Sequence, residues 1–203
     1  MKIICIGRNY SAHAKELGNN IPTEPVFFLK PDTAIPQKGH PFFIPDFTSN
    51  VHYEVELVIR INRLGKYIEE RFAHKYYHEI GLGIDFTARD IQDTLKTKGL
   101  PWEKAKGFDG SAVISKEFIS KDKLDLSNIQ FSLYKNNELV QEGHSSNMIF
   151  HFDKIIAFLS QFVTLKIGDL IFTGTPSGVG QVQNGDILEG FIDNQKMFSV
   201  SVK

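Results

Sequence analysis

The chain contains the stretch Val51-His52-Tyr53-Glu54-Val55-Glu56-Leu57-Val58-Ile59-Arg60-Ile61. Its residues alternate with the two-residue period of a β-strand, which predicts a strand over residues 51–61. One predicted face is wholly aliphatic and consists of Val55, Leu57, Ile59 and Ile61. The other face carries Glu54, Glu56, Val58 and Arg60, so two carboxylates point the same way, roughly 7 Å apart along the strand.

Downstream of this strand, a mostly apolar run at residues 80–86 predicts a buried strand that contains Asp85. Thr87 is expected to cap a helix that continues to about Lys98 and ends at Gly99.

The C-terminal half is predicted to be mainly strands. A hairpin is expected from strands 129–134 and 138–141, and apolar residues at helical spacing predict a helix over 153–162. Two Gly-Asp turns, at 168–169 and 185–186, each lead into a strand.

The N-terminal region offers only a short helix, over residues 11–17 with Gly18 as its stop. Residues 22–45 hold six of the chain's prolines, which excludes a long helix there. Many strands, few helices and no regular βαβ alternation predict the α+β class.

The composition is that of an ordinary globular protein, and its 203 residues fit one domain over 1–203. Lys plus Arg total 23 and Asp plus Glu total 24, so no basic face that would bind nucleic acid or a membrane is expected. One cysteine and an N-terminal apolar stretch too short for a signal peptide predict a cytoplasmic protein.

A third carboxylate, Asp85, is the strongest indication of a metal site. Glu54 and Glu56 alone would be ordinary residues of a solvent-facing strand, but a carboxylate inside an apolar run needs a partner. Three carboxylates form a hard ligand set that suits Mg²⁺ or Mn²⁺. An alternative set that includes His52 would favour zinc or iron.

Other candidate residues are ambiguous when taken one at a time. His13 and Glu16, three apart on the short helix, would make an oriented general base or a surface pair. Lys106 lies in a glycine-containing segment and would be catalytic or merely a solvated charge. The glycine-rich turn 174–180 could aim N–H groups and the Thr175 hydroxyl at an anion.

Several motifs occur in a specific order along nearly the whole chain. They are Gly7-Arg8-Asn9-Tyr10 with His13 and Glu16, Phe28-Leu29-Lys30-Pro31, Glu54-x-Glu56-Leu57, Asp85-Phe86-Thr87-Ala88-Arg89-Asp90-x-Gln92, Gly99-Leu100-Pro101-Trp102 with Lys106, Met148-Ile149-Phe150 and Thr173-Gly174-Thr175-Pro176-x-Gly178-Val179-Gly180. In this order they resemble the fumarylacetoacetate hydrolase family, most closely its short members that act as acylpyruvases and oxaloacetate decarboxylases.

The resemblance implies a mixed β-roll or β-sandwich core with a few short helices, and a homodimer. It implies Mg²⁺ or Mn²⁺ on the residues that match Glu54, Glu56 and Asp85. It also implies a catalytic dyad on a lid, a catalytic lysine and four positions near the substrate. The dyad is His13 with Glu16, and the catalytic lysine is Lys106. The positions near the substrate are Lys30, Arg89, Gln92 and Thr175.

The function expected from these parts is metal-dependent chemistry on a small 2-oxo acid. The acid would chelate the ion, which would stabilise the enolate formed when a bond to C3 changes. The expected reactions are hydrolysis of the C–C bond of acylpyruvates and decarboxylation of oxaloacetate. An alternative is a 2-hydroxy-dienedioate isomerase of aromatic catabolism, and another is a binding protein without catalysis.

Overall fold

The computed structural model describes residues 1–16, 21–37 and 39–203. Its largest sheet has seven strands, six of them in the order β2-β1-β11-β4-β5-β7, with β8 also pairing with β5. Their bounds are Val26–Lys30, Ile3–Gly7, Leu170–Phe172, Val55–Ile61, Tyr77–Asp85, Ala112–Ile114 and, for β8, Ile119–Ser120. The pair β1 and β11 is parallel and the other pairs are antiparallel, so the sheet is mixed.

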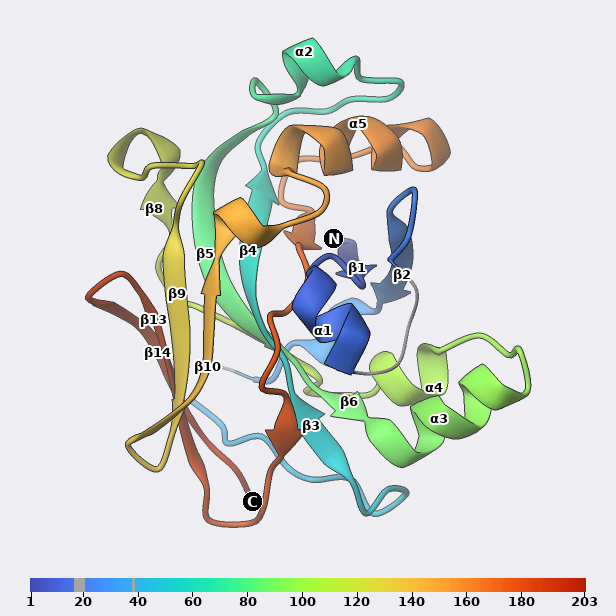
Figure 1. Cartoon of the computed structure of the whole chain (residues 1–203), viewed down its shortest axis with the longest axis vertical. Helices are drawn as coiled ribbons and strands as arrows, with labels where there is room; N and C mark the ends of the chain where they lie inside the picture. Colours follow the sequence, from blue (N-terminus) through green and yellow to red (C-terminus); the bar gives the residue numbers. More distant parts are fainter. Residues whose placement is uncertain (17–20, 38) are drawn as a thin grey trace.

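Two smaller sheets complete the β-structure (Figure 1). The four-stranded one has the order β10-β9-β13-β14, with bounds Glu138–His144, Gln130–Lys135, Ile187–Ile192 and Gln195–Ser201. The three-stranded one has the order β12-β3-β6, with bounds Gly180–Gln181, Val51–Tyr53 and Thr87–Ala88.

The described helices are short and lie around the sheets. They are α1 (Ser11–Glu16), α2 (Glu70–Ala73), α3 (Arg89–Thr97), α4 (Glu103–Lys106) and α5 (Phe152–Phe162). Helices α3 and α4 lie next to each other beside β6, where Figure 1 shows both in green. Mixed sheets with few helices confirm the predicted α+β class.

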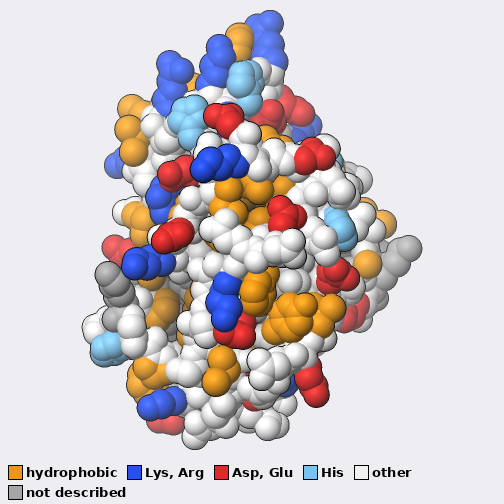
Figure 2. Space-filling model, turned by 90° about the vertical axis from the view of Figure 1, so that its left-hand side faces the viewer, with side chains coloured by type: hydrophobic (Ala, Val, Ile, Leu, Met, Phe, Trp, Pro, Cys, Tyr) orange, Lys and Arg blue, Asp and Glu red, His pale blue; other side chains and the backbone are white. Residues whose placement is uncertain are grey.

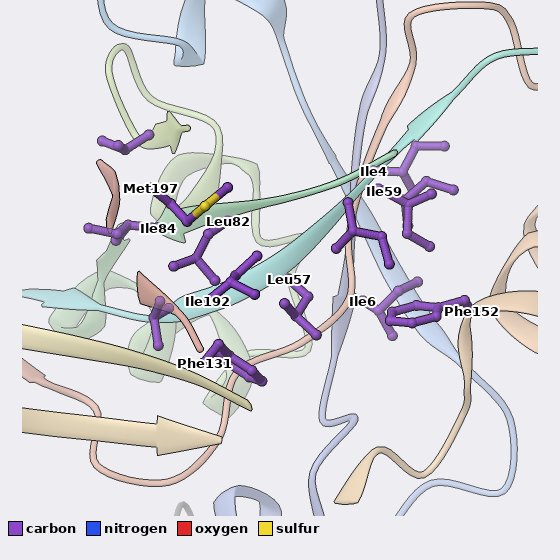
Figure 3. Packing of buried hydrophobic residues seen from close by; sticks show 14 of the residues in the cluster. Ile4, Ile6, Leu57, Ile59, Leu82, Ile84, Phe131, Phe152, Ile192 and Met197 are labelled. Atoms are coloured by element: carbon purple, nitrogen blue, oxygen red, sulfur yellow. The ribbon is translucent and has the colours of Figure 1, made fainter. Parts of the chain in front are cut away.

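The core forms on both faces of the large sheet. Leu57 and Ile59 of β4 belong to the larger cluster, which also contains Phe131 of β9 and Ile192 of β13 (Figure 3). The opposite face of β4 contributes Val58 to a second buried cluster. Each fully buried aliphatic side chain contributes roughly 1.5–3 kcal/mol, so burial on both faces holds β4 firmly in place. The predicted aliphatic face of residues 51–61 is confirmed.

The single strand predicted over 51–61 is wrong in one respect, because the structure divides it at Glu54. Before that residue, β3 pairs with β6 and β12, whereas after it β4 joins the large sheet. The Glu54 carbonyl still accepts a hydrogen bond from the Asp85 N–H at 2.9 Å. The chain therefore passes from one sheet to another at Glu54, a change of pairing that alternation along a sequence does not reveal.

The predicted role of Thr87 as a helix cap is also wrong. Thr87 lies in β6, and α3 begins at Arg89 after an Ala88 cap position that makes no side-chain hydrogen bond. The other end of this helix is as predicted, since Gly99 follows it with φ +64°.

The hairpin of β9 and β10 and helix α5 confirm the predictions for 129–141 and 153–162. Helix α1 confirms the short N-terminal helix as far as Glu16, while residues 17 and 18 lie outside the described residues. Within the described ranges, no helix is both long and apolar enough to cross a membrane. On the face drawn in Figure 2, acidic and basic side chains are interspersed.

Candidate metal centre and active-site pocket

Three carboxylates meet where β4 and β5 run side by side. Glu54 lies at the junction of β3 and β4, Glu56 lies on β4, and Asp85 is the last residue of β5. Each of the three is at most 5% exposed, and one oxygen from each lies within 4.8 Å of the others. The predicted carboxylate set is therefore assembled, and it can hold a metal ion. That these residues are its ligands stays a prediction.

Lys106, on α4, lies in the middle of this acidic cluster. Its Nζ donates to Glu54 Oε2 at 2.8 Å, to Asp85 Oδ2 at 2.7 Å and to the Thr87 hydroxyl at 2.6 Å. Burial alone would lower the pKa of Lys106, but the Asp85 and Glu54 carboxylates outweigh it and raise the pKa to about 12. With 3% exposure, Lys106 is a buried ammonium and not a solvated surface charge.

Arg89 and Gln92 line one wall of the cluster from α3. Arg89 donates to Glu54 and, at 2.6 Å, to Gln92 Oε1. Burial alone would raise the pKa of Glu54, but Lys106 and Arg89 hold it well below its usual range. Glu54 is therefore ionised in the folded protein.

Glu56 has a different electrostatic environment. Burial, followed by repulsion from Asp85 and Glu54, raises its pKa well above the usual range, against an opposing effect of Lys106 and a hydrogen bond from the Gly174 N–H at 2.7 Å. A cation bound among the three carboxylates would relieve this repulsion and favour the ionised form of Glu56.

Lys30 lies behind Asp85 and does not line the pocket. Its ammonium donates to Ser111 Oγ at 2.9 Å and to the carbonyls of Ser111 and Lys106. It is also 2.8 Å from Asp85 Oδ1, although this oxygen accepts no hydrogen bond of good geometry. Substrate contact by Lys30 stays a prediction, and in the structure its charge supports Asp85.

The predicted dyad is present on α1. His13 Nδ1 lies 3.0 Å from Glu16 Oε2, and the buried His13 ring lines the same pocket as the three carboxylates. The Gly178 N–H donates to Glu16 Oε1 at 3.1 Å. The glycine-rich turn thus directs two of its N–H groups, those of Gly174 and Gly178, at protein carboxylates.

Thr175 of the same turn lines the pocket as predicted. Its hydroxyl accepts a hydrogen bond from Gln141 Nε2 at 2.9 Å. Gly174, with φ +100°, precedes it, and a Cβ there would come within 2.7 Å of Asn9 Cβ. The turn needs glycine at this position to approach the N-terminal strand.

His52, the alternative ligand, does not join the metal-binding cluster found among the described residues. Its Nε2 lies 2.9 Å from Asn50 Oδ1, and burial, then repulsion from Arg89, lowers its pKa.

Besides Ile6 and Gly7, four larger pocket residues had no role in the sequence analysis. They are Arg8, Phe28, Lys96 and Trp102. Three of them lie in motifs that carry the family resemblance, but no spacing rule connects them with the carboxylates. Lys96 is indistinguishable in the sequence from Lys98, which directly follows its helix.

Comparison with known proteins agrees with the fold. Residues 2–198 match the family described as fumarylacetoacetate (FAA) hydrolase C-terminal. The chain is 45% identical over 192 residues to the mitochondrial oxaloacetate tautomerase FAHD1 of Rattus norvegicus, covering 94% of this chain and 86% of the relative. It is 45% identical over 190 residues to the mitochondrial oxaloacetate decarboxylase of Dictyostelium discoideum, covering 93% and 87%.

Solved structures show the same architecture. A fumarylpyruvate hydrolase from Pseudomonas aeruginosa in complex with Mn²⁺ and pyruvate superposes with a TM-score of 0.92 at 36% identity, covering 100% of this chain and 89% of that one. A 5-carboxymethyl-2-hydroxymuconate delta-isomerase from Mycobacterium smegmatis gives 0.85 at 32% identity, covering 99% and 78%. This chain belongs to the fumarylacetoacetate hydrolase family of enzymes.

Proposed function

We propose that the protein is a divalent-metal-dependent enzyme that acts on oxaloacetate or a closely related 2-oxo acid, changing the bonds at C3. The observation that carries this proposal is the convergence of three buried carboxylates, the His13–Glu16 pair and the Lys106 ammonium on one pocket. The names of the relatives, an oxaloacetate tautomerase and an oxaloacetate decarboxylase, support the choice of substrate.

The residues present fit a hard divalent cation. The donors are three buried carboxylates, and carboxylate oxygens are the ligands that such ions prefer. Glu54, Glu56 and Asp85 would hold the ion, and we propose Mg²⁺ or Mn²⁺. A bound ion would withdraw electrons from the 2-oxo group of the substrate, which makes the C3 protons more acidic. The Mn²⁺ and pyruvate in the Pseudomonas structure support this choice of metal and ligand.

His13 would move the proton. Its Nδ1 faces Glu16, so the carboxylate favours the tautomer with hydrogen on Nδ1 and leaves Nε2 free to accept a proton from C3. Glu16 stabilises the positive charge that the ring then carries. Lys106, with its pKa raised to about 12, stays protonated and would stabilise negative charge that develops on substrate oxygen.

A second candidate reaction is hydrolysis of the C–C bond of acylpyruvates. The same His13–Glu16 pair is suited to deprotonating a water molecule for attack on the distal carbonyl, with Lys106 facing the oxyanion. The fumarylpyruvate hydrolase neighbour supports this reaction. The muconate isomerase neighbour supports a third, the isomerisation of 2-hydroxy-dienedioates, which requires only proton transfer.

The three reactions are distinguished by the products they release and by the loss of enol absorbance. The purified protein would be incubated with oxaloacetate, acetylpyruvate and a 2-hydroxy-dienedioate, each with Mg²⁺, with Mn²⁺ and with excess chelator. Loss of enol absorbance without pyruvate release indicates tautomerisation, pyruvate with CO₂ indicates decarboxylation, and pyruvate with a carboxylic acid indicates hydrolysis. Absence of any metal-stimulated reaction across the panel would refute the proposed function.

A further inference from the structure

Two cationic side chains line the pocket beside the proposed reaction centre. Arg8 follows β1, and Lys96 lies on α3, and both line the pocket that contains the three carboxylates. The Arg8 guanidinium carbon lies 5.8 Å from the centre of the Trp102 ring, and Lys96 Nζ lies 6.0 Å from it. One aromatic ring therefore brings together two positive charges that are far apart in the sequence.

The charges of this pair are not matched by acidic side chains. In the part of the chain that the structure describes, neither Arg8 nor Lys96 forms a salt bridge, whereas Arg89 is paired with Glu54. Burial, then repulsion from Arg89, lowers the pKa of Lys96, and Arg8 acts in the same direction. Asp93, one turn away on α3, raises the pKa of Lys96 by its negative charge but does not outweigh the opposing effects. Two positive charges that line one pocket without forming a salt bridge favour an anion from outside.

The backbone at Arg8 supports a functional role for its side chain. Arg8 has φ +60°, in the left-handed region that residues other than glycine adopt rarely. Such conformations are strained, persist where the surroundings impose them, and concentrate at ligand-binding sites. Here the conformation belongs to a residue that lines the pocket.

An aromatic wall connects the cation pair with the reaction centre. The Trp102 ring packs edge-on against Phe28 at 5.9 Å, and Lys106 Nζ lies 5.1 Å from the Phe28 ring centre. A ligand held by the carboxylate cluster at one end would lie along this wall, with its other end next to Arg8 and Lys96.

We propose that Arg8 and Lys96, both next to Trp102, form a specificity site for the distal carboxylate of a dianionic 2-oxo acid. This inference rests on the proposed function and extends it, since it assigns two residues to the choice between substrates with a charged and with an uncharged tail. The pair takes no part in moving protons; it orients the substrate.

The test compares two ligands of equal carbon number, oxaloacetate and 2-oxobutyrate, whose tails are a carboxylate and a methyl group. Lys96→Met and Arg8→Met are each expected to raise the KM for oxaloacetate by about 10- to 100-fold, the usual worth of a hydrogen bond to a charged group. The inhibition constant of 2-oxobutyrate should change by less than about twofold, because its uncharged tail gains nothing from the cations.

Lys98→Met is the matched control, since Lys98 follows the same helix and is exposed. It should leave both constants unchanged. If the Arg8 variant fails to fold, Lys96→Met and the charge reversal Lys96→Glu test the specificity site. Lys96→Glu should raise the KM for oxaloacetate more than Lys96→Met does.

The outcomes separate this inference from the proposed function. Turnover of oxaloacetate by the unmodified protein with an unchanged KM in Lys96→Met would overturn the specificity site alone. Absence of turnover across the whole substrate panel would refute the proposed function, and calorimetric binding of oxaloacetate and 2-oxobutyrate in the presence of Mn²⁺ would then test the site by the same comparison. Absence of binding as well would overturn both.

Discussion

Gly178 donates its backbone N–H to Glu16 Oε1 at 3.1 Å, across 162 positions of sequence. This contact joins the glycine-rich turn to the helix that carries His13. The other oxygen of the same carboxylate lies 3.0 Å from His13 Nδ1. Glu16 therefore orients the imidazole and also links α1 to the glycine-rich turn.

Replacement of Glu16 by glutamine should separate these two roles. The amide oxygen of Glu16→Gln can still accept from Gly178, but the side chain no longer stabilises a positive imidazole. We expect kcat to fall by about 10- to 100-fold, the usual contribution of a charge-assisted hydrogen bond, with little change in KM. Steady-state kinetics and thermal unfolding measure both effects, with the exposed Glu117→Gln as control. If kcat falls equally in the Glu117→Gln control, the effect is not specific to Glu16, and the proposed role of Glu16 in the mechanism is wrong.

The predicted lid can be tested separately, by hydrogen exchange. A six-residue helix such as α1 is marginal without tertiary contacts, so it should be loosely held in the free enzyme. Oxalate with Mn²⁺ should slow amide exchange over residues 11–16 relative to Mn²⁺ alone. Unchanged exchange in a sample shown to contain bound oxalate would mean that α1 does not close over ligand.

Metal affinity should distinguish a proposed ligand from the proposed base. We expect Glu56→Ala to weaken Mn²⁺ binding by at least about 100-fold, because even residues outside the coordination sphere contribute about 10- to 100-fold. His13→Ala should bind Mn²⁺ almost as the unmodified protein does. Isothermal titration with Mn²⁺ gives both values. The reverse result, with His13→Ala losing the ion, would exchange the two roles.

The sequence predicted the site better than it predicted the elements that build it. The two-residue spacing of Glu54 and Glu56 was informative because a strand keeps the directions of its side chains, even though the structure interrupts the strand at Glu54. Asp85 could be recognised because its run is apolar and a buried carboxylate needs a partner. His13 and Glu16 were found by helical spacing, which survives in a helix of only six residues.

What the sequence did not reveal depends on contacts between distant segments. Nothing near Thr87 indicates that its hydroxyl accepts from Lys106, so local propensity favoured a helix cap. Lys30 ends an apolar run and Lys106 lies among charged residues, but neither context reveals that one lies behind Asp85 and the other lines the pocket. The approach of Arg8 and Lys96 to Trp102 likewise arises only when β1, α3 and α4 pack together.

Three expectations stay predictions. They are the single domain over 1–203, the homodimer and the cytoplasmic location. Light scattering of the purified protein tests the dimer directly, because two chains of 23.0 kDa double the measured mass.

Lys106→Met should affect both turnover and stability. Loss of a donor that faces a developing oxyanion typically lowers the rate by about 10²–10³-fold. Removal of this buried ammonium also leaves Glu54 and Asp85 without their central partner, which typically costs about 3–5 kcal/mol in the metal-free protein. Mn²⁺ should restore much of that stability, since a cation would again neutralise the carboxylates. Lys104→Met, exposed on the same helix, is the control. Unchanged unfolding and unchanged turnover would show that Lys106 is dispensable.

Asp169 should make the fold sensitive to acid. Its buried carboxylate accepts from the Lys2 N–H at 2.8 Å, the Lys166 N–H at 2.7 Å and the Lys2 ammonium. Burial alone would raise the pKa of Asp169, but these hydrogen bonds outweigh it and lower the pKa below its usual value. The folded state thus binds a proton less readily than the unfolded state does. Its stabilisation is complete above the unfolded pKa of about 3.9 and is lost as the pH falls through the lower folded pKa.

Asp169→Asn should therefore destabilise the protein at pH 7 by about 1.5–3 kcal/mol, the usual worth of a hydrogen bond to a charged group. The turn that carries Asp169 leads into β11, whose parallel pairing with β1 joins the β1–β2 pair to the rest of the large sheet, so this loss should appear in global unfolding. Urea unfolding at pH 7 and at pH 3 measures the difference between the variant and the unmodified protein. The difference in unfolding free energy should shrink at pH 3, because the native carboxylate is then partly protonated and stabilises the fold less. The exposed Asp109→Asn is the control and should neither destabilise the protein at pH 7 nor show a pH-dependent difference. A difference that is the same at both pH values would mean that Asp169 stabilises the turn by shape alone and not through its charge.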